Sequence, residues 1–267
     1  MNDSPAQVMG IINTTDDSFH SSSRVETAEA AVRRAGEMLE AGASILDIGG
    51  CSTRPGCTVV DEETETAHVI PAIRAIARQF PGVEISVDTF RARVAEKAAD
   101  TGATLINDIS GGDFDPQMFP TVARLKLPYI LMHTIGMPDN MASHAVYKDV
   151  TAEVIAHLEE RLARLQSLGV GNVILDPGFG FAKNSEQNYR LLRDLPRFKA
   201  LGRPVLVGIS RKGMIWKNLG ITPAEALNGT TVLNTLALTL GADILRVHDV
   251  KEAVEAVKLF SLLQGIA

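Results

Sequence analysis

Short apolar runs recur along the chain, and each is followed by a polar or glycine-rich segment and then by apolar residues at helical spacing. We interpret eight of these runs as strands, at residues 7–12, 44–48, 83–87, 104–106, 129–132, 173–175, 205–207 and 244–247. The helical spacing is found at residues 27–39, 62–77, 91–99, 150–168, 186–198, 223–240 and 251–263. Strand and helix therefore alternate throughout, as in folds built on a buried parallel sheet.

Several helical stretches end in the same signal, a glycine shortly before the next apolar run. The segments are AGAS at 41–44, TGAT at 101–104, LGVGNV at 168–173, LGRPV at 201–205 and LGADI at 240–244. Glycine adopts the left-handed conformation that ends a helix at little steric cost. We expect a helix to end at each of these glycines.

Eight strand and helix units predict an α/β fold, a single closed (β/α)8 TIM barrel that covers residues 1–267 as one domain. The alternative at this length is a doubly wound open sheet. That fold would carry a Gly-x-Gly-x-x-Gly turn after its first strand, and no such turn follows residues 7–12. No linker or low-complexity tract divides the chain, so we favour the barrel.

Composition and charge narrow the possible functions. Of the 267 residues, 22% are charged and 45% hydrophobic, with a mean hydropathy of +0.08, which is typical of a globular protein. No apolar run could span a membrane and residues 1–8 lack the regions of a signal peptide, so we expect a cytoplasmic protein without a membrane partner. The net charge of −6, without a basic stripe, argues against a nucleic-acid partner. Cys51 and Cys57 form neither a metal-ligand set nor a disulfide framework.

Polar residues stand where the predicted strands end. In a barrel these positions lie at the carboxyl-terminal mouth, where the active sites of this fold are found. The residues are Asn13, Asp47, Asp88, Asn107, Asp108, His133, Asp176, Ser210, Arg211, Lys212, Arg246 and His248. One polar residue at a turn is unremarkable, but a polar group on every strand indicates a binding site.

An acidic group of these residues suits a flat heterocycle. Asp176 ends an apolar run and is followed by Pro177 and a glycine pair in DPGFG, so backbone can approach a planar ligand closely. A 2-amino-4-oxopyrimidine presents two adjacent N–H donors to a carboxylate, while the remaining ring acceptors can bond to an amide and an ammonium. Asp88, Asn107 and Lys212 supply these groups. Asp88 and Asp108 have the alternative role of helix caps.

A second group is basic and indicates a phosphate or diphosphate site. Arg246 and His248 are two residues apart at the end of the last strand, so their side chains point to the same face. Arg54, in the STRPG loop, would add a third cation. Ser210 lacks the Gly-x-Ser-x-Gly frame of a nucleophile, so we exclude a hydrolase and expect it to bind substrate. The polar loops 14–24 and 51–59 could close over the site.

Eight motifs, in this order along nearly the whole chain, resemble the dihydropteroate synthases of the folate pathway. They are MGIINTTDDSF, DIGGCSTRPG, SVDT, INDISGG, LMH with GMPDNM, DPGFGFAKNSEQN, GISRK and RVHDV. The resemblance implies a (β/α)8 barrel, usually a homodimer. It implies a transferase that condenses 6-hydroxymethyl-7,8-dihydropterin diphosphate with p-aminobenzoate to give 7,8-dihydropteroate and diphosphate.

The resemblance also implies a role for each residue of the site. It assigns the pterin to Asp88, Asn107, Asp176 and Lys212, and the diphosphate to Asn13, Arg54, Arg246 and His248, with Mg²⁺ near Asn13. It places Phe19, Thr53, Arg54, Pro55 and Ser210 at the p-aminobenzoate pocket, which sulfonamides also occupy in this family. Asp47 supports the reacting end, so Asp88, Asp176, Lys212 and Asp47 form the expected catalytic set.

The first loops depart from the family pattern. Asp16 stands where the family usually has proline, which loses a fixed φ and adds a negative charge near the diphosphate, and Cys51 precedes STRPG. Two alternatives follow. One is a pterin-binding paralogue without catalytic activity. The other is a methyltetrahydrofolate-binding methyltransferase, which would not need STRP, SRK and RVH together.

Overall fold

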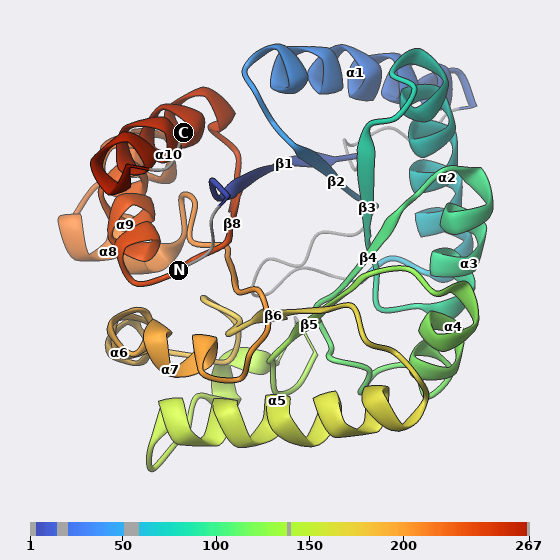
Figure 1. Cartoon of the computed structure of the whole chain (residues 1–267). Helices are drawn as coiled ribbons and strands as arrows, with labels where there is room; N and C mark the ends of the chain where they lie inside the picture. Colours follow the sequence, from blue (N-terminus) through green and yellow to red (C-terminus); the bar gives the residue numbers. More distant parts are fainter. Residues whose placement is uncertain (1–3, 15–20, 51–58, 138–139, 266–267) are drawn as a thin grey trace.

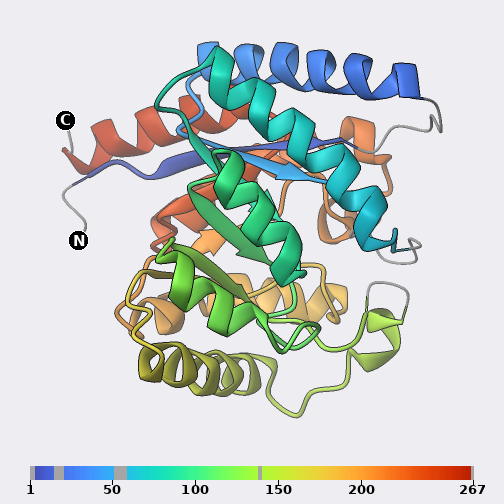
Figure 2. The same cartoon turned by 90° about the vertical axis from the view of Figure 1, so that its right-hand side faces the viewer.

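The computed structural model describes residues 4–14, 21–50, 59–137 and 140–265, without the side chains of residues 21–27 and 142. Within these ranges the chain alternates between strands that gather at the centre and helices that surround them (Figure 1). The first described residues and the end of the last helix lie at the same end of the molecule (Figure 2). The architecture agrees with the predicted (β/α)8 barrel.

Eight parallel strands form the sheet, in the order β6-β5-β4-β3-β2-β1-β8-β7. A bridge between Leu175 and Val205 joins the two outer strands of this order and closes the barrel. The strands are β1 (Gln7–Asn13), β2 (Ile45–Gly49), β3 (Glu84–Asp88), β4 (Leu105–Asp108), β5 (Tyr129–Met132), β6 (Val173–Asp176), β7 (Leu206–Val207) and β8 (Ile244–Val247). All eight lie where the apolar runs predict them.

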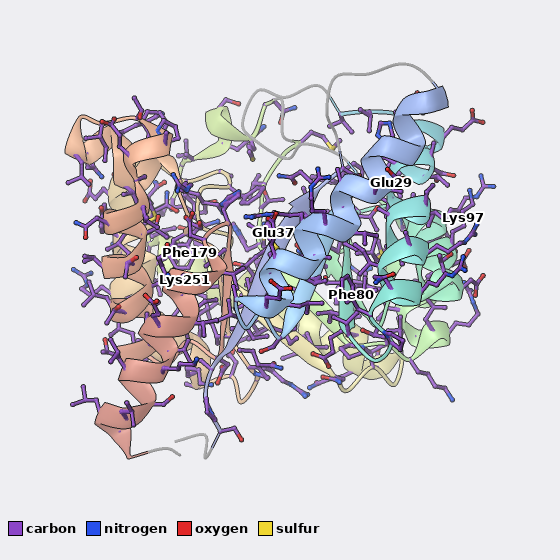
Figure 3. The ribbon with its side chains drawn as sticks, turned by 90° about the horizontal axis from the view of Figure 1, so that it is seen from above. Glu29, Glu37, Phe80, Lys97, Phe179 and Lys251 are labelled. Carbon is purple, nitrogen blue, oxygen red and sulfur yellow. The ribbon has the colours of Figure 1, made fainter. Side chains whose placement is uncertain are left out.

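Ten α-helices occur among the described residues. They are α1 (Ser21–Glu40), α2 (Glu62–Gln79), α3 (Ala92–Thr101), α4 (Met118–Leu125), α5 (Val150–Ser167), α6 (Ser185–Arg193), α7 (Leu195–Lys199), α8 (Gly213–Leu219), α9 (Leu227–Thr239) and α10 (Val250–Gln264). Two short 3-10 turns, η1 (Met141–His144) and η2 (Pro223–Glu225), precede α5 and α9. Charged side chains such as Glu37, Lys97 and Lys251 lie on the outer helices, whereas Phe179 lies inside (Figure 3).

Proline, glycine and a capping box account for several of the helix boundaries. The predicted helix at 186–198 is divided, because Pro196 in the first turn of α7 cannot donate to the preceding turn. Gly42, Gly102, Gly169, Gly202 and Gly241, which the sequence analysis expected to end helices, all have positive φ. Asn184 begins α6 with a capping box to Gln187.

A single layer of apolar side chains fills the barrel below the carboxyl ends of the strands. It consists of Met9, Ile45, Leu105, Ile130, Ile174, Leu206 and Ile244, all buried. A much larger core lies between the strands and the helices. The barrel interior is therefore packed at this level, and a ligand that enters from the carboxyl-terminal mouth can reach only the level above it.

Candidate functional site

The site is the layer of side chains directly above this apolar layer. Because alternate residues of a strand face the same side, the next inward residue lies two positions further along. These positions are Ile11, Asp47, Asn107, Met132, Asp176, Gly208 and Arg246. On β3 the inward residue at this end is Asp88, which is in register with Gly49 and Asn107. On four strands, the inward side chain is therefore apolar in the lower layer and charged or an amide in the layer directly above it.

Arg246 joins two carboxylates on other strands. Its Nε donates to Asp47 Oδ2 at 2.6 Å, and its Nη2 donates to Asp88 Oδ2 at 2.6 Å. Asn107 Nδ2 also donates to Asp47 Oδ2, at 3.0 Å. The sequence analysis grouped Arg246 with the cations of an anion site, apart from the carboxylates. The structure adds a contact that this grouping did not predict, and the group of two carboxylates and one guanidinium has a formal charge of −1.

Each of these two carboxylates keeps one oxygen free. Asp47 Oδ1 and Asp88 Oδ1 are buried and have no hydrogen-bond partner among the described residues. A buried acceptor without a donor is costly, so both atoms indicate that a ligand supplies the missing N–H or O–H groups. Burial raises the pKa of Asp88 to about 7, while Arg246 lowers it and Asp47 raises it further.

Asp176 and Lys212 face the same layer from β6 and from the loop after β7. Asp176 Oδ1 accepts a hydrogen bond from Gly178 N at 2.7 Å, which fixes the carboxylate at the start of the loop. Burial raises the pKa of Asp176, and the nearby ammonium of Lys212 opposes the shift. Lys212 donates to the carbonyl of Phe179 and lies over the ring of Phe181, 4.7 Å from its centroid.

A glycine keeps the space between Lys212 and Arg246 open. A Cβ built on Gly208 would lie 3.8 Å from Arg246 Cβ and 4.0 Å from Lys212 Nζ. Asp176 interacts electrostatically with both Lys212 and Arg246. The carboxylate that we expect to bind the pterin therefore lies within electrostatic range of the guanidinium that we expect to bind the diphosphate. That both face one ligand space stays a prediction.

Ser210 and His248 form a second contact at this end of the barrel. Ser210 Oγ accepts from His248 N at 3.2 Å and lies 3.1 Å from His248 Nδ1. The buried Ser210 hydroxyl therefore orients the imidazole. Arg211, next in the chain, instead turns to Asp249 in a bidentate ion pair, so it anchors the loop rather than facing the polar layer.

Several residues that the sequence analysis considered have structural contacts. Asp108 accepts from Ser110 N, Gly112 N and Tyr129 Oη, so it organises the loop after β4, a role close to the capping alternative. Asp88 caps no helix and bonds to Arg246 instead. The roles proposed for Phe19, Thr53, Arg54 and Pro55 stay predictions, because these residues lie outside the described ranges.

Asn13 is the residue expected near Mg²⁺. It ends β1, and its side chain is exposed at the mouth of the barrel. In the described part of the chain, no three His, Cys, Asp or Glu side chains gather into a metal site. Mg²⁺ commonly keeps few protein ligands and takes the rest from substrate phosphates and water. One amide oxygen beside a diphosphate fits that mode of binding.

A cavity of about 780 Å³ lies at the opposite end of the barrel. Its lining includes the starts of the strands, at Gln7, Ile45 and Ile244, and the ion pair of Lys199 with Asp243. None of the unpartnered buried atoms lies in this lining. The unpartnered oxygens of Asp47 and Asp88 lie instead at the carboxyl-terminal mouth.

The chain is similar over most of its length to proteins of one known family. Residues 9–248 match the model of the family "Pterin binding enzyme". The dihydropteroate synthase of Escherichia coli is 44% identical over 254 residues, which are 94% of this chain and 89% of that protein. Two solved structures are also similar, each over at least 96% of both chains. They are Yersinia pestis dihydropteroate synthase in a sulfonamide drug complex, with a TM-score of 0.92 and 39% identity, and the Xanthomonas albilineans enzyme in complex with 7,8-dihydropteroate, with 0.87 and 37%.

No helix in the described ranges is long and apolar enough to cross a membrane.

Proposed function

The chain belongs to the family of pterin-binding enzymes, and we propose that the polar layer of its barrel divides the reaction of a dihydropteroate synthase between two groups of residues. The chain is a transferase of folate biosynthesis. It condenses 6-hydroxymethyl-7,8-dihydropterin diphosphate with p-aminobenzoate, and it releases 7,8-dihydropteroate and diphosphate. The observation that carries the proposal is the pair of unpartnered, buried carboxylate oxygens of Asp47 and Asp88, whose other oxygens bind Arg246.

In this proposal the carboxylates and the amide hold the pterin ring. Asp176 accepts from the two adjacent N–H donors of the aminopyrimidine edge, because its position is already fixed by Gly178. Lys212 donates to ring acceptors on the same face. Asn107, held by Asp47, completes the recognition. The unpartnered Oδ1 of Asp88 accepts a further N–H of the dihydropterin.

The charge of the layer favours breakage of the C–O bond at the pterin methylene group. The electron-rich ring spreads the resulting positive charge, and the negative group of Asp47, Asp88 and Arg246 lies beside it. The amine of p-aminobenzoate, neutral at pH 7, gives its lone pair to the methylene carbon. A C–N bond forms, the C–O bond has broken, and the nitrogen loses a proton to water.

The departing diphosphate is received by Arg246, His248, Arg54 and Asn13. Ser210 keeps the imidazole of His248 directed for this contact, and we also place Ser210 at the edge of the p-aminobenzoate pocket with Phe19, Thr53 and Pro55. Mg²⁺ bound near Asn13 would neutralise charge on the diphosphate oxygens. The protein's own task is to position both substrates and to exclude water.

We also propose that two copies of the chain associate through α9 and α10. These helices are neighbours (Figure 1). They expose five large apolar side chains, those of Val232, Leu236, Leu259, Leu262 and Leu263. Exposed apolar patches of this kind commonly mark protein interfaces. Light scattering coupled to gel filtration tests the proposal: twice the chain mass is expected, and Leu259→Glu with Leu262→Glu should return the single-chain mass.

The experiment for the catalytic function supplies the pterin diphosphate, p-aminobenzoate and Mg²⁺ and follows the release of diphosphate. We expect release that depends on p-aminobenzoate. Binding of the pterin without any release of diphosphate would instead identify a paralogue that has lost activity. Asp176→Asn is the matched control, because it keeps the size of the side chain and an acceptor for Gly178 N but loses the carboxylate.

A further inference from the structure

A buried lysine holds the loop that carries the pterin carboxylate. Lys183 ends the segment that follows β6 and is 9% exposed. Its Nζ lies 3.0 Å from His133 Nδ1 and donates to three backbone carbonyls, those of Phe181 at 2.9 Å, Gly178 at 3.0 Å and His133 at 3.3 Å. Two of these carbonyls belong to its own loop and the third belongs to the end of β5.

Four acceptors gather around this amine. Three carbonyl oxygens and an imidazole nitrogen lie within hydrogen-bond distance of Lys183 Nζ, and an ammonium offers three N–H donors to them. Burial lowers the pKa of His133 well below its ordinary value, with Lys183 and His157 acting in the same direction, so the ring is neutral and its Nδ1 can accept. Burial also lowers the pKa of Lys183, to about 7, while Asp176 opposes this shift. The neutral amine keeps only two N–H donors, so the ammonium is the form that satisfies more of these buried acceptors.

The same loop packs closely against the end of β5 and has an unfavourable backbone conformation at Ala182. A Cβ on Gly178 would lie 2.0 Å from the carbonyl oxygen of His133, so loop and strand are in direct contact. Gly178 has φ of 72° and Ala182 has φ of 48°, both in the left-handed region. A non-glycine residue in this conformation persists where its surroundings hold it.

Two groups of the site depend directly on the conformation of this loop. Asp176 accepts from Gly178 N, and His133 N donates to the carbonyl of Asp176. Lys212 donates to the carbonyl of Phe179 within the loop. The charge of Lys183 also acts on Asp176, whose carboxylate it favours.

We propose that Lys183 is a positioning residue for pterin recognition, because its ammonium clamps residues 177–183 against the end of β5 and so aligns Asp176 and Lys212 with the pterin ring. Lys183 does not contact the ring. The proposal rests on the function proposed above. The proposal is that Lys183 affects the binding of the pterin and does not affect the binding of p-aminobenzoate.

The test compares pterin binding and steady-state kinetics of Lys183→Met with the unsubstituted protein. Methionine keeps length and apolar volume but removes the charge and all donors. We expect the Kd for 6-hydroxymethyl-7,8-dihydropterin and the KM for its diphosphate to rise at least tenfold, with the KM for p-aminobenzoate changed less than twofold. Lys183→Gln keeps an N–H donor without the charge, so its pterin Kd should lie between the values of Lys183→Met and of the unsubstituted protein. This variant replaces Lys183→Met in the test if the methionine variant fails to fold.

Two controls separate positioning from loss of stability. Tyr147→Phe removes another hydrogen bond to this loop, the one from Tyr147 Oη to the carbonyl of Ala182, and should leave the pterin Kd within twofold. Leu158→Ala empties a buried position on α5 and should lower Tm without changing the Kd. Lys183→Ala with added propylammonium should regain pterin affinity.

Three results would overturn the proposal: unchanged pterin affinity in Lys183→Met, equal rises in both KM values, or no recovery with propylammonium. Failure of the proposed function would look different, because the unsubstituted protein would then release no diphosphate from the pterin diphosphate, whether or not it binds the pterin.

Discussion

Arg246 and Asp88 lie 158 residues apart in the chain and are joined by a hydrogen bond of 2.6 Å between Nη2 and Oδ2. The guanidinium also bonds to Asp47, so one cation of β8 reaches carboxylates of β2 and β3. The side chain of Asp47 is fully buried and that of Arg246 is 17% exposed. In the proposed function, the reacting end of the pterin would lie beside this group, whose charges are already arranged before substrate binds.

Arg246→Met should destabilise the fold by about 3–5 kcal/mol at pH 8, the usual cost of removing one partner of a buried ion pair. The loss should be smaller at pH 6, because burial raises the pKa of Asp88 to about 7 and the unpaired carboxyl can then take up a proton. Urea unfolding at both pH values measures this difference. Equal losses at pH 6 and pH 8 would mean that Asp88 is not coupled to Arg246.

The pKa of Asp88 also predicts how activity depends on pH. Its carboxylate is needed in the ionised form, and a pKa raised to about 7 leaves it increasingly protonated as the pH falls from 8 to 6. We expect kcat/KM to decrease roughly tenfold for each pH unit below about 7. The profile of Asp88→Asn should be lower and flat over this range, and a sloping profile in that variant would assign the titration to another group.

Gly208→Ala tests whether the space between Lys212 and Arg246 belongs to the pterin. The added Cβ meets only ordinary contacts of 3.8 to 4.0 Å, so the free energy of unfolding should change by less than about 1 kcal/mol. The KM for the pterin diphosphate should nevertheless rise at least tenfold, because the methyl group enters the ligand space. Calorimetric melting and steady-state kinetics give the two quantities, and an unchanged KM would place the ring elsewhere.

Gly178→Ala, in contrast to Gly208→Ala, should strongly destabilise the fold. Its Cβ would overlap the carbonyl oxygen of His133, and the residue has positive φ. We expect a large fall in Tm and little soluble protein. Comparable Tm values for the alanine variants at 208 and 178 would contradict the distinction between an open space and a close backbone contact.

The sequence predicts the strands and most of the helices because short apolar runs alternate regularly with stretches of helical spacing. All eight strands lie at such runs, and the glycines that end the helices have a conformation that other residues adopt with difficulty. Helix α4 has only eight residues and contains Pro120, too little for a helical period to be recognised. Asp176 was found because a buried strand passes directly into DPG.

Contacts between distant residues could not be predicted in the same way. The bonds of Arg246 to Asp47 and Asp88 depend on the pairing of β8 with β1, which lets the Arg246 side chain reach the carboxylates of β2 and β3. Lys183 stands before the helix cap Asn184, where lysine is usually exposed, and no local pattern reveals its burial. The burial of Lys183 is evident only in the folded loop, where three carbonyl oxygens converge on its Nζ.

The most direct test of the account is the affinity of Asp176→Asn for 6-hydroxymethyl-7,8-dihydropterin, measured by isothermal titration calorimetry. Each hydrogen bond to a charged group contributes about 1.5–3 kcal/mol, so loss of two such bonds should raise the Kd at least a hundredfold. Asp113→Asn, at an ion pair with Arg161 on the outside of the barrel, is the control and should bind normally. An unchanged Kd in Asp176→Asn would show that the polar layer is not where the pterin is recognised.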